Sequence, residues 1–211
     1  MHGQAHIDPS LPEAPLGHQR AFFLFPGYDT VRNPHAPVAA LRPRQKFEMA
    51  YRATFDPGLV VRAAFVSGFD EAASVGPNYG PGASGFGELF GYNAANVASM
   101  NFFTYGLLPV AFHQDPRYFR KGSGSAKSRV WWALRSEFVA YSDKGDEMPN
   151  YSSMLGYGMS TALSAAYLPP ENVSFGKTME GIGIKEGVGW GLNLMHEFRL
   201  SSLVRRRLRQ H

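Results

Sequence analysis

The sequence predicts an all-α fold: a single bundle-like domain of five or six helices with an extended proline-rich N-terminal arm. From Arg44 onward, apolar residues recur at helical spacing in several segments. No segment sustains the alternation of apolar and polar residues that is typical of a half-buried strand. Residues 1–43 hold seven prolines and show no helical period. A chain of 211 residues is long enough to bury the core of one domain.

The chain divides into an extended N-terminal arm (1–43), a helical domain (44–203) and a basic C-terminal tail (204–211). The arm carries an aromatic run at 21–30. Because large apolar rings are unfavourable in water, we expect this run to dock on the body as an extended segment.

Two helices are predicted directly after the arm. In the first, over 44–55, five residues share one face and are expected to point inward: Phe47, Ala50, Tyr51, Thr54 and Phe55. Asp56 is a good N-cap and Pro57 suits a first turn, so the second helix is predicted from Pro57 to about Ser74. Its inward residues would be Val60, Val61, Ala64 and Phe65.

Two spans carry no formal charge, residues 89–112 and residues 148–170. Both are long enough to cross a bilayer. The first contains three asparagines and the second is rich in serine and glycine, which is too polar for a confident membrane span. The sequence favours buried or interfacial helices and leaves open whether the two spans cross or lie on a membrane.

Two more helices are predicted in the C-terminal half. Over 125–141, Ser125 is a cap, and the inward stripe is Val130, Leu134, Phe138 and Tyr141. The last helix runs from Ser174 to about Leu203 and has glycines four residues apart at Gly183, Gly187 and Gly191. Small residues at that spacing let two helix backbones approach closely, so we predict helix packing at these three positions.

The stretch HQDPRYFRKGSGS, residues 113–125, concentrates polar side chains. Asp115-Pro116 repeats the pattern of Asp56-Pro57, which predicts a capped helical turn that Gly122 and Gly124 end. Capping does not explain four basic residues, which are therefore candidates for binding an anion or for pairing with acids: His113, Arg117, Arg120 and Lys121.

No catalytic motif stands out. The absence of cysteine excludes disulfides, thiolate zinc sites and cysteine nucleophiles. The chain contains no G-x-x-x-x-G-K-[ST], G-x-S-x-G or H-E-x-x-H. Three carboxylates could serve acid–base chemistry, but the sequence singles out no pair: Glu88, Asp115 and Glu137. We therefore predict no metal and no cofactor, assign no catalytic residue, and consider an enzyme uncertain and less favoured.

The positive charge is local. The net charge is +4, yet the last thirteen residues alone hold five arginines and no acid. Residues 113–135 hold six basic residues against Asp115. A local basic patch suits an anionic surface such as phospholipid headgroups, or it is simply solvated. Binding of this basic charge to nucleic acid is a weaker expectation. The first fifteen residues do not have the pattern of a signal peptide.

Several short motifs together resemble a known family. They are RQKF (44–47), FDP (55–57), HQDPRYFRKGSGS (113–125), NYS (150–152), AYLP (166–169) and EF (197–198). The combination resembles an uncharacterised exported protein family of Acidobacteria with a DPRYFR motif, over roughly residues 41–198. Members often end in EFWPD, whereas RLSS follows Phe198 here. The resemblance implies an exported protein of the periplasm or outer envelope and no particular reaction.

Two functions follow as hypotheses. The first is a non-enzymatic cell-envelope protein that associates with a membrane surface or a larger protein assembly, which could be a homo-oligomer. Its helices with small residues and its basic patches would make these contacts. The alternative is an enzyme or anionic-ligand-binding protein with its site around HQDPRYFR.

Overall fold

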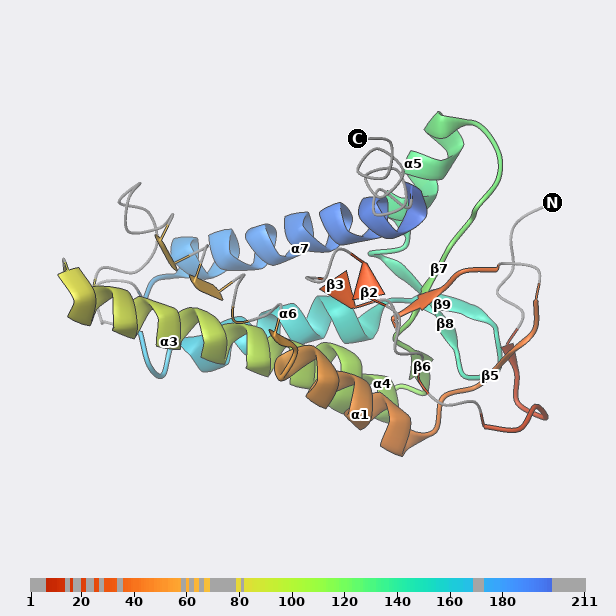
Figure 1. Ribbon diagram of the computed structural model, residues 1–211, viewed down its shortest axis with the longest axis horizontal. Helices are drawn as coiled ribbons and strands as arrows, with labels where there is room; N and C mark the ends of the chain where they lie inside the picture. The colour runs from red at the N-terminus through yellow and green to blue at the C-terminus, as the bar shows by residue number, and fades with distance from the viewer. Residues whose placement is uncertain are drawn as a thin grey trace, which may run out of the picture.

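The computed structural model describes residues 7–13, 16, 20–21, 25–26, 29–33, 36–57, 60, 63–64, 67–68, 79–80, 82–168 and 173–198. Its helices form an elongated body, and most of its short strands gather at one end of that body (Figure 1). The two longest helices, α3 (Gly82–Asn101) and α7 (Phe175–Phe198), run along the length of the body (Figure 1).

The other helices fill the space around these two. A π-helical stretch, η1 (Phe102–Leu107), and α4 (Leu108–Ala111) continue α3 without a break. The remaining helices are α1 (Pro43–Thr54), α5 (Ala126–Arg135) and α6 (Tyr151–Ser164). η1 packs on both α1 and α6, and α7 packs on α5 at one end and on α6 along its length.

Short strands pair segments that are far apart in the sequence. The largest sheet has three strands in the order β6 (Gln114–Asp115), β8 (Val139–Ser142) and β9 (Glu147–Pro149). β4 (Thr30–Val31) pairs in parallel with β7 (Tyr118–Phe119). The other pairs are β1 (Ile7–Asp8) with β5 (Val38–Ala39), and β2 (Arg20–Ala21) with β3 (Phe25–Pro26).

The predicted all-α class is therefore wrong, because a helix-dominated body carries several small sheets. Strands of two to four residues are too short for alternation to show in the sequence. Their partners come from the arm and from 113–149, so only tertiary pairing creates them. The arm supplies core residues as well: Ile7 and Val31 form an apolar cluster with Phe119 and Tyr141.

The segment after His113 is not the predicted helical turn. Gln114–Asp115 and Tyr118–Phe119 are strands, and Asp115 Oδ1 accepts the backbone N–H of Arg117 at 3.0 Å within the turn between them. An Asp-Pro pair suits such a turn as well as a helix N-cap, so the local pattern could not decide between them. Asp56, in contrast, lies buried directly before Pro57, which is helical.

The face of α1 differs from the prediction at its aromatic residues, although Ala50 is buried as predicted. Phe47, Tyr51 and Phe55 are exposed, whereas Met49 and Lys46 are buried. The Lys46 ammonium donates to both carboxylate oxygens of Asp143, at 2.7 and 2.8 Å, and to the carbonyl of Pro109 at 3.1 Å. Because these partners satisfy the charge, a polar face of α1 can point inward.

The other predicted helices have mixed outcomes. The Ser125 cap is confirmed, since its Oγ accepts the Ser128 N–H at 3.2 Å. The helix ends at Arg135, however, so the predicted stripe breaks up: Val130 and Phe138 are exposed and Tyr141 lies on β8. In the second predicted helix, Val60 is exposed, whereas Val61 and Phe65 lie outside the described residues. The predicted basic tail, residues 204–211, also lies outside them.

Candidate functional site

Glu197, near the end of α7, holds the DPRYFR segment to the helix. Its carboxylate is fully buried. It accepts hydrogen bonds from Tyr118 Oη (2.9 Å), Lys121 N (2.8 Å), Gly122 N (3.0 Å) and Arg129 Nε (2.7 Å). Burial alone would raise the pKa of Glu197, but these donors outweigh it and hold the pKa below its usual range. Glu197 is therefore an ionised anchor between α7, α5 and the loop after β7.

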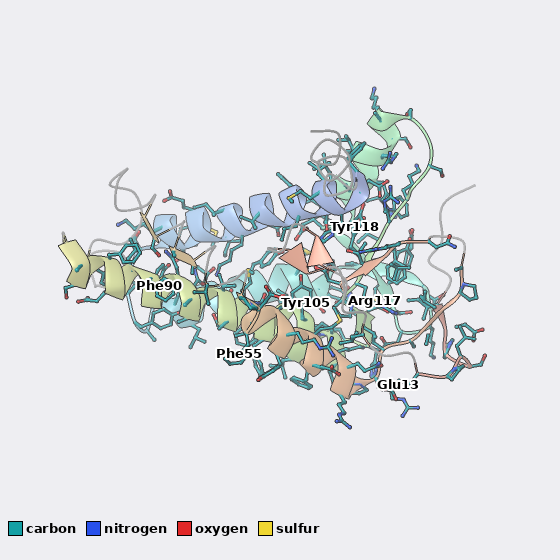
Figure 2. The ribbon with its side chains drawn as sticks, in the orientation of Figure 1. Glu13, Phe55, Phe90, Tyr105, Arg117 and Tyr118 are labelled. Atoms are coloured by element: carbon teal, nitrogen blue, oxygen red, sulfur yellow. The ribbon has the colours of Figure 1, made fainter. Side chains whose placement is uncertain are left out.

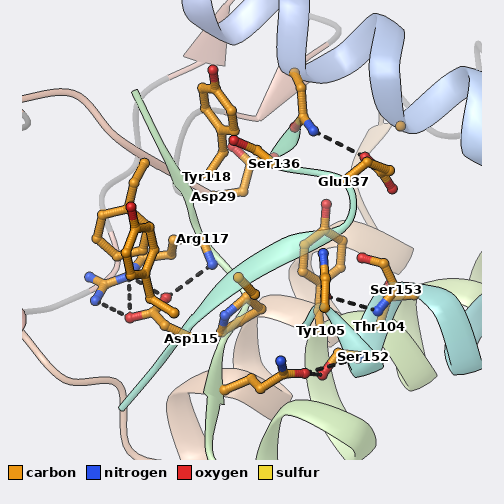
Figure 3. A pocket seen from close by; sticks show the side chains of 18 of the residues that line it. Asp29, Thr104, Tyr105, Asp115, Arg117, Tyr118, Ser136, Glu137, Ser152 and Ser153 are labelled. Carbon is orange, nitrogen blue, oxygen red and sulfur yellow. Dashed lines mark hydrogen bonds and ion pairs between the residues drawn. The ribbon is translucent and has the colours of Figure 1, made fainter. Parts of the chain in front are cut away.

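A cavity of about 100 Å³ lies beside this anchor, between α6, α7 and the β6-β8-β9 sheet. Figure 3 shows polar side chains around it from widely separated parts of the chain. Its ionisable lining residues include Asp29, Asp115, Arg117, Glu137 and His196. Figure 2 shows that Tyr105, Arg117 and Tyr118 lie toward the middle of the molecule, whereas Phe55 lies at its edge.

Glu137 is buried at the helix side of the cavity. Its carboxylate accepts the Tyr157 hydroxyl at 2.6 Å and the Asn193 amide at 3.0 Å (Figure 3 draws the second contact). A Cβ at Gly189 would come within 2.4 Å of Oε1, so only a glycine lets α7 approach this carboxylate so closely. Burial raises the pKa of Glu137 to about 7, with a smaller contribution from the charge of Glu186.

Asp29 and His196 also line the cavity. Thr30 Oγ1 donates to Asp29 Oδ1 at 3.1 Å and lies 2.9 Å from His196 Nδ1. His196 Nε2 and Asp29 Oδ2 are 3.6 Å apart. The Tyr118 N–H donates to the Asp29 carbonyl at 2.7 Å, which ties this group to the β4–β7 pair.

The four predicted anion-binding residues do not converge on one site. Arg117 forms a bidentate pair with Asp115, and its Nη2 donates to the Ala39 carbonyl at 2.8 Å. Arg120 Nε donates to the Glu197 carbonyl at 2.8 Å, and Lys121 Nζ to Ser128 Oγ at 2.5 Å. His113 is 85% exposed, with φ of 52°. Of the four, Arg117 alone lines the cavity, and Asp115 neutralises its charge.

The predicted packing glycines of α7 face open space. A Cβ at Gly183, Gly187 or Gly191 would meet nothing within 4 Å, helix backbone and chain neighbours aside. The close contacts of α7 occur instead at Gly189, against Glu137, and at Gly181, 3.4 Å from Thr161 Cγ2.

Helices α6 and α7 turn polar side chains inward and apolar ones outward. On α6, Leu155, Met159 and Leu163 are 46%, 41% and 47% exposed. Four hydroxyl residues of the same helix are buried: Ser152, Ser160, Thr161 and Ser164. On α7, Lys185 is buried, and its ammonium donates to Ser160 Oγ and Thr161 Oγ1, both at 2.8 Å. Ile184 and Val188, on the outer side of α7, are more than half exposed.

No three His, Asp or Glu side chains in the described part of the chain gather where they could hold a metal ion. Nor does any helix of that part have the length and hydropathy needed to cross a bilayer. Of the three carboxylates that the sequence offered for acid–base chemistry, Asp115 and Glu137 share the cavity, while Glu88 is exposed on α3. The sequence does not predict a role for three further polar residues of this region, because none of them belongs to a recognisable motif: Asp29, Lys185 and Asn193.

Comparisons with family models, with characterised proteins and with solved structures find no significant match.

Proposed function

We propose that the chain is a non-enzymatic cell-envelope protein that associates with a membrane surface through the outer faces of α6 and α7. The observation that carries this proposal is the inverted polarity of α6, whose hydroxyl side chains are buried while its leucines and methionines are exposed. The envelope location is supported only by the family resemblance of the DPRYFR segment.

Leu155, Met159 and Leu163 occupy successive turns of α6, so their side chains form one continuous stripe. Soluble proteins rarely leave large contiguous apolar patches in water. The span 148–170 around the stripe has no formal charge. A lipid surface suits this stripe better than a folded partner would, because it requires no matching charges or shape.

A second group of exposed apolar side chains, the aromatic patch, which we define as Phe47, Tyr51, Phe55 and Phe102, lies along α1 and η1. The rings of Phe47 and Phe102 are 6.1 Å apart, and those of Tyr51 and Phe55 are 4.7 Å apart. All four side chains are exposed. Arg42 and Arg44, exposed at the start of α1, would lie near anionic headgroups if this patch met a membrane.

Flotation with lipid vesicles tests the proposal. We expect the full chain to float with vesicles, and more strongly with anionic phosphatidylglycerol than with pure phosphatidylcholine. The triple variant Leu155→Ser/Met159→Ser/Leu163→Ser should bind roughly 100-fold more weakly. Three half-exposed side chains would lose burial worth about 3 kcal/mol in all.

The matched control is Val130→Ser/Trp131→Ser, which removes exposed apolar side chains from α5 instead. This control should float like the unmodified chain. A wild-type chain that stays in solution with both vesicle types would overturn the proposal, as would a triple variant that floats unchanged.

Assembly through α7 is a second candidate, favoured by the open glycine face. Gly183 and Gly187 flank the exposed Ile184, and a partner helix could approach closely at such a face. Sedimentation of the full chain would then show an oligomer that Gly187→Ile disrupts. Gly158→Ile, at an equally open position on α6, should leave the oligomer intact. A monomer at high concentration rejects this candidate.

A further inference from the structure

An aromatic pair lies at the surface on the C-terminal half of α7. The rings of Trp190, on α7, and Phe138, which follows α5, have centroids 6.1 Å apart and an interplanar angle of 64°. Trp190 is 38% exposed and Phe138 is 44% exposed. Edge-to-face contacts of this kind are favourable, yet a large part of both rings remains in contact with solvent. The two rings therefore offer a preformed apolar contact to something outside the chain.

Trp190 borders the open face of α7. Gly187 is three residues from both Ile184 and Trp190, so it neighbours both side chains on the helix surface. A Cβ at Gly187 would meet nothing within 4 Å, helix backbone and chain neighbours aside. Ile184 is more than half exposed. Trp190 thus belongs to the same outer surface of α7 that is proposed to meet a membrane.

The sequence directly after α7 carries positive charge only. Residues 199–211 follow Phe198 and contain five arginines and no aspartate or glutamate. Phe198 comes eight residues after Trp190, which corresponds to about 12 Å along a helix axis. Arginines close to an anionic leaflet are attracted to it, and the attraction falls off within about a Debye length, roughly 10 Å. This charge complements anionic headgroups, and it begins near the aromatic pair.

We propose that Trp190 and Phe138, together with the arginines that follow Phe198, hold the C-terminal part of α7 at the headgroup level of an anionic phospholipid membrane. This inference rests on the proposed function, which supplies the membrane. A tryptophan suits the headgroup level because its ring is apolar and its indole N–H is polar. Apolar burial and attraction to anionic lipid together strengthen binding at a membrane surface.

Tryptophan fluorescence tests the position of Trp190. The full-chain variant Trp131→Phe retains Trp132 and Trp190. With phosphatidylglycerol vesicles its emission should shift to shorter wavelength, and lipid with brominated acyl chains should quench it. The matched control is Trp131→Phe/Trp190→Phe, which retains Trp132 alone. The Trp132 indole N–H donates to the Phe119 carbonyl at 2.8 Å, so its surroundings belong to the protein and its emission should not change.

Substitutions in the full chain test the role of the arginines. Arg205→Gln/Arg206→Gln should weaken binding to phosphatidylglycerol vesicles roughly tenfold or more, because each arginine near an anionic surface adds to the attraction. Binding to phosphatidylcholine should not change. Arg205→Lys/Arg206→Lys keeps the charge at the same positions and should bind phosphatidylglycerol like the unmodified chain.

The outcomes separate this inference from the proposed function. If the chain floats with vesicles but the emission of Trp131→Phe stays unchanged, the inference is overturned and the proposed function stands. Equal binding of phosphatidylglycerol by the glutamine and lysine variants also overturns it. A chain that floats with neither vesicle type overturns both. A shift to shorter wavelength on concentrating Trp131→Phe without lipid would indicate a second copy on this face, and it would overturn the inference as well.

Discussion

The strand end and the helical end of the molecule treat buried polar groups differently. At the strand end, two buried carboxylates have charged partners: Glu197 pairs with Arg129 and Asp115 with Arg117. At the helical end, the partners of the buried Lys185 in the described part of the chain are two hydroxyls of α6, and burial lowers its pKa to about 8. Ion pairs thus satisfy two buried carboxylates at the strand end, whereas neutral hydroxyls satisfy a buried ammonium at the helical end.

The largest expected effect is at the strand end. Glu197→Gln removes the charge of a fully buried carboxylate that Arg129 and three further donors hold, and it should lower the free energy of unfolding by about 3–5 kcal/mol. Urea unfolding followed by circular dichroism measures the loss. Glu147→Gln is the control, because the side chains of its ion pair with Arg135 are 38% and 34% exposed, and the pair should contribute less than about 1 kcal/mol. Similar losses for both variants would contradict the anchor role of Glu197.

The second-largest expected effect is a dependence of the free energy of unfolding on pH, caused by Glu137. The pKa of Glu137 is about 7 in the folded state, above its ordinary value of 4.5, because burial disfavours the ionised form. Its contribution to stability is therefore complete below pH 4.5 and falls as the pH rises through 7, by at most roughly 3 kcal/mol. Glu137→Gln should remove this fall, and urea unfolding at pH 5 and pH 8 compares the two proteins. An unchanged pH profile would show that Glu137 keeps an ordinary pKa.

Alanine substitutions at two glycines of α7 should change the stability of the fold in opposite directions. Gly189→Ala places a Cβ against the Glu137 carboxylate and should destabilise the fold by about 1–3 kcal/mol. Gly187→Ala adds a methyl group in open space on the same helix and should stabilise it by about 0.5–1 kcal/mol. Thermal unfolding of both variants provides the comparison. Destabilisation by Gly187→Ala would mean that this face is already packed.

The smallest effect is expected on the outer face of α6. Leu155→Ser and Met159→Ser should each change the free energy of unfolding in lipid-free buffer by no more than about 0.5 kcal/mol, because both side chains are half exposed. Ser160→Leu, which forces a large side chain into a fully buried site of the same helix, should cost several times as much. Chemical unfolding measures all three, and a large loss from Leu155→Ser would show that this face is buried.

Helix positions could largely be predicted from the sequence, but helix orientations could not. The uncharged span 148–170 contains α6, and the Ser125 cap is found as predicted. The helical spacing of apolar residues over 44–55 predicts that they point inward, because burial normally drives such spacing. Ala50 is buried as predicted, but the burial of Lys46 depends on its pairing with Asp143, a partner 97 residues away that the local pattern cannot identify.

The candidate site could be predicted only in part, for the same reason. The DPRYFR segment was identified as unusual, and it does reach the cavity through Asp115, Arg117 and Tyr118. Its partner Glu197 belongs to the EF pair that carried part of the family resemblance, yet no spacing rule links the two. Glu137 acquires its raised pKa only because α7 covers it at Gly189.

The contacts of Glu197 also constrain how the chain can fold during synthesis. The Asp29 carbonyl, the loop at residues 120–122 and Glu197 meet at one place, although they come from the beginning, middle and end of the chain. Contacts between segments so far apart are slow to form. A ribosome-bound chain can pair β4 with β7 early, but the anchor cannot close until α7 has emerged. A nascent chain halted before residue 197 should therefore expose the DPRYFR loop to proteases and chaperones.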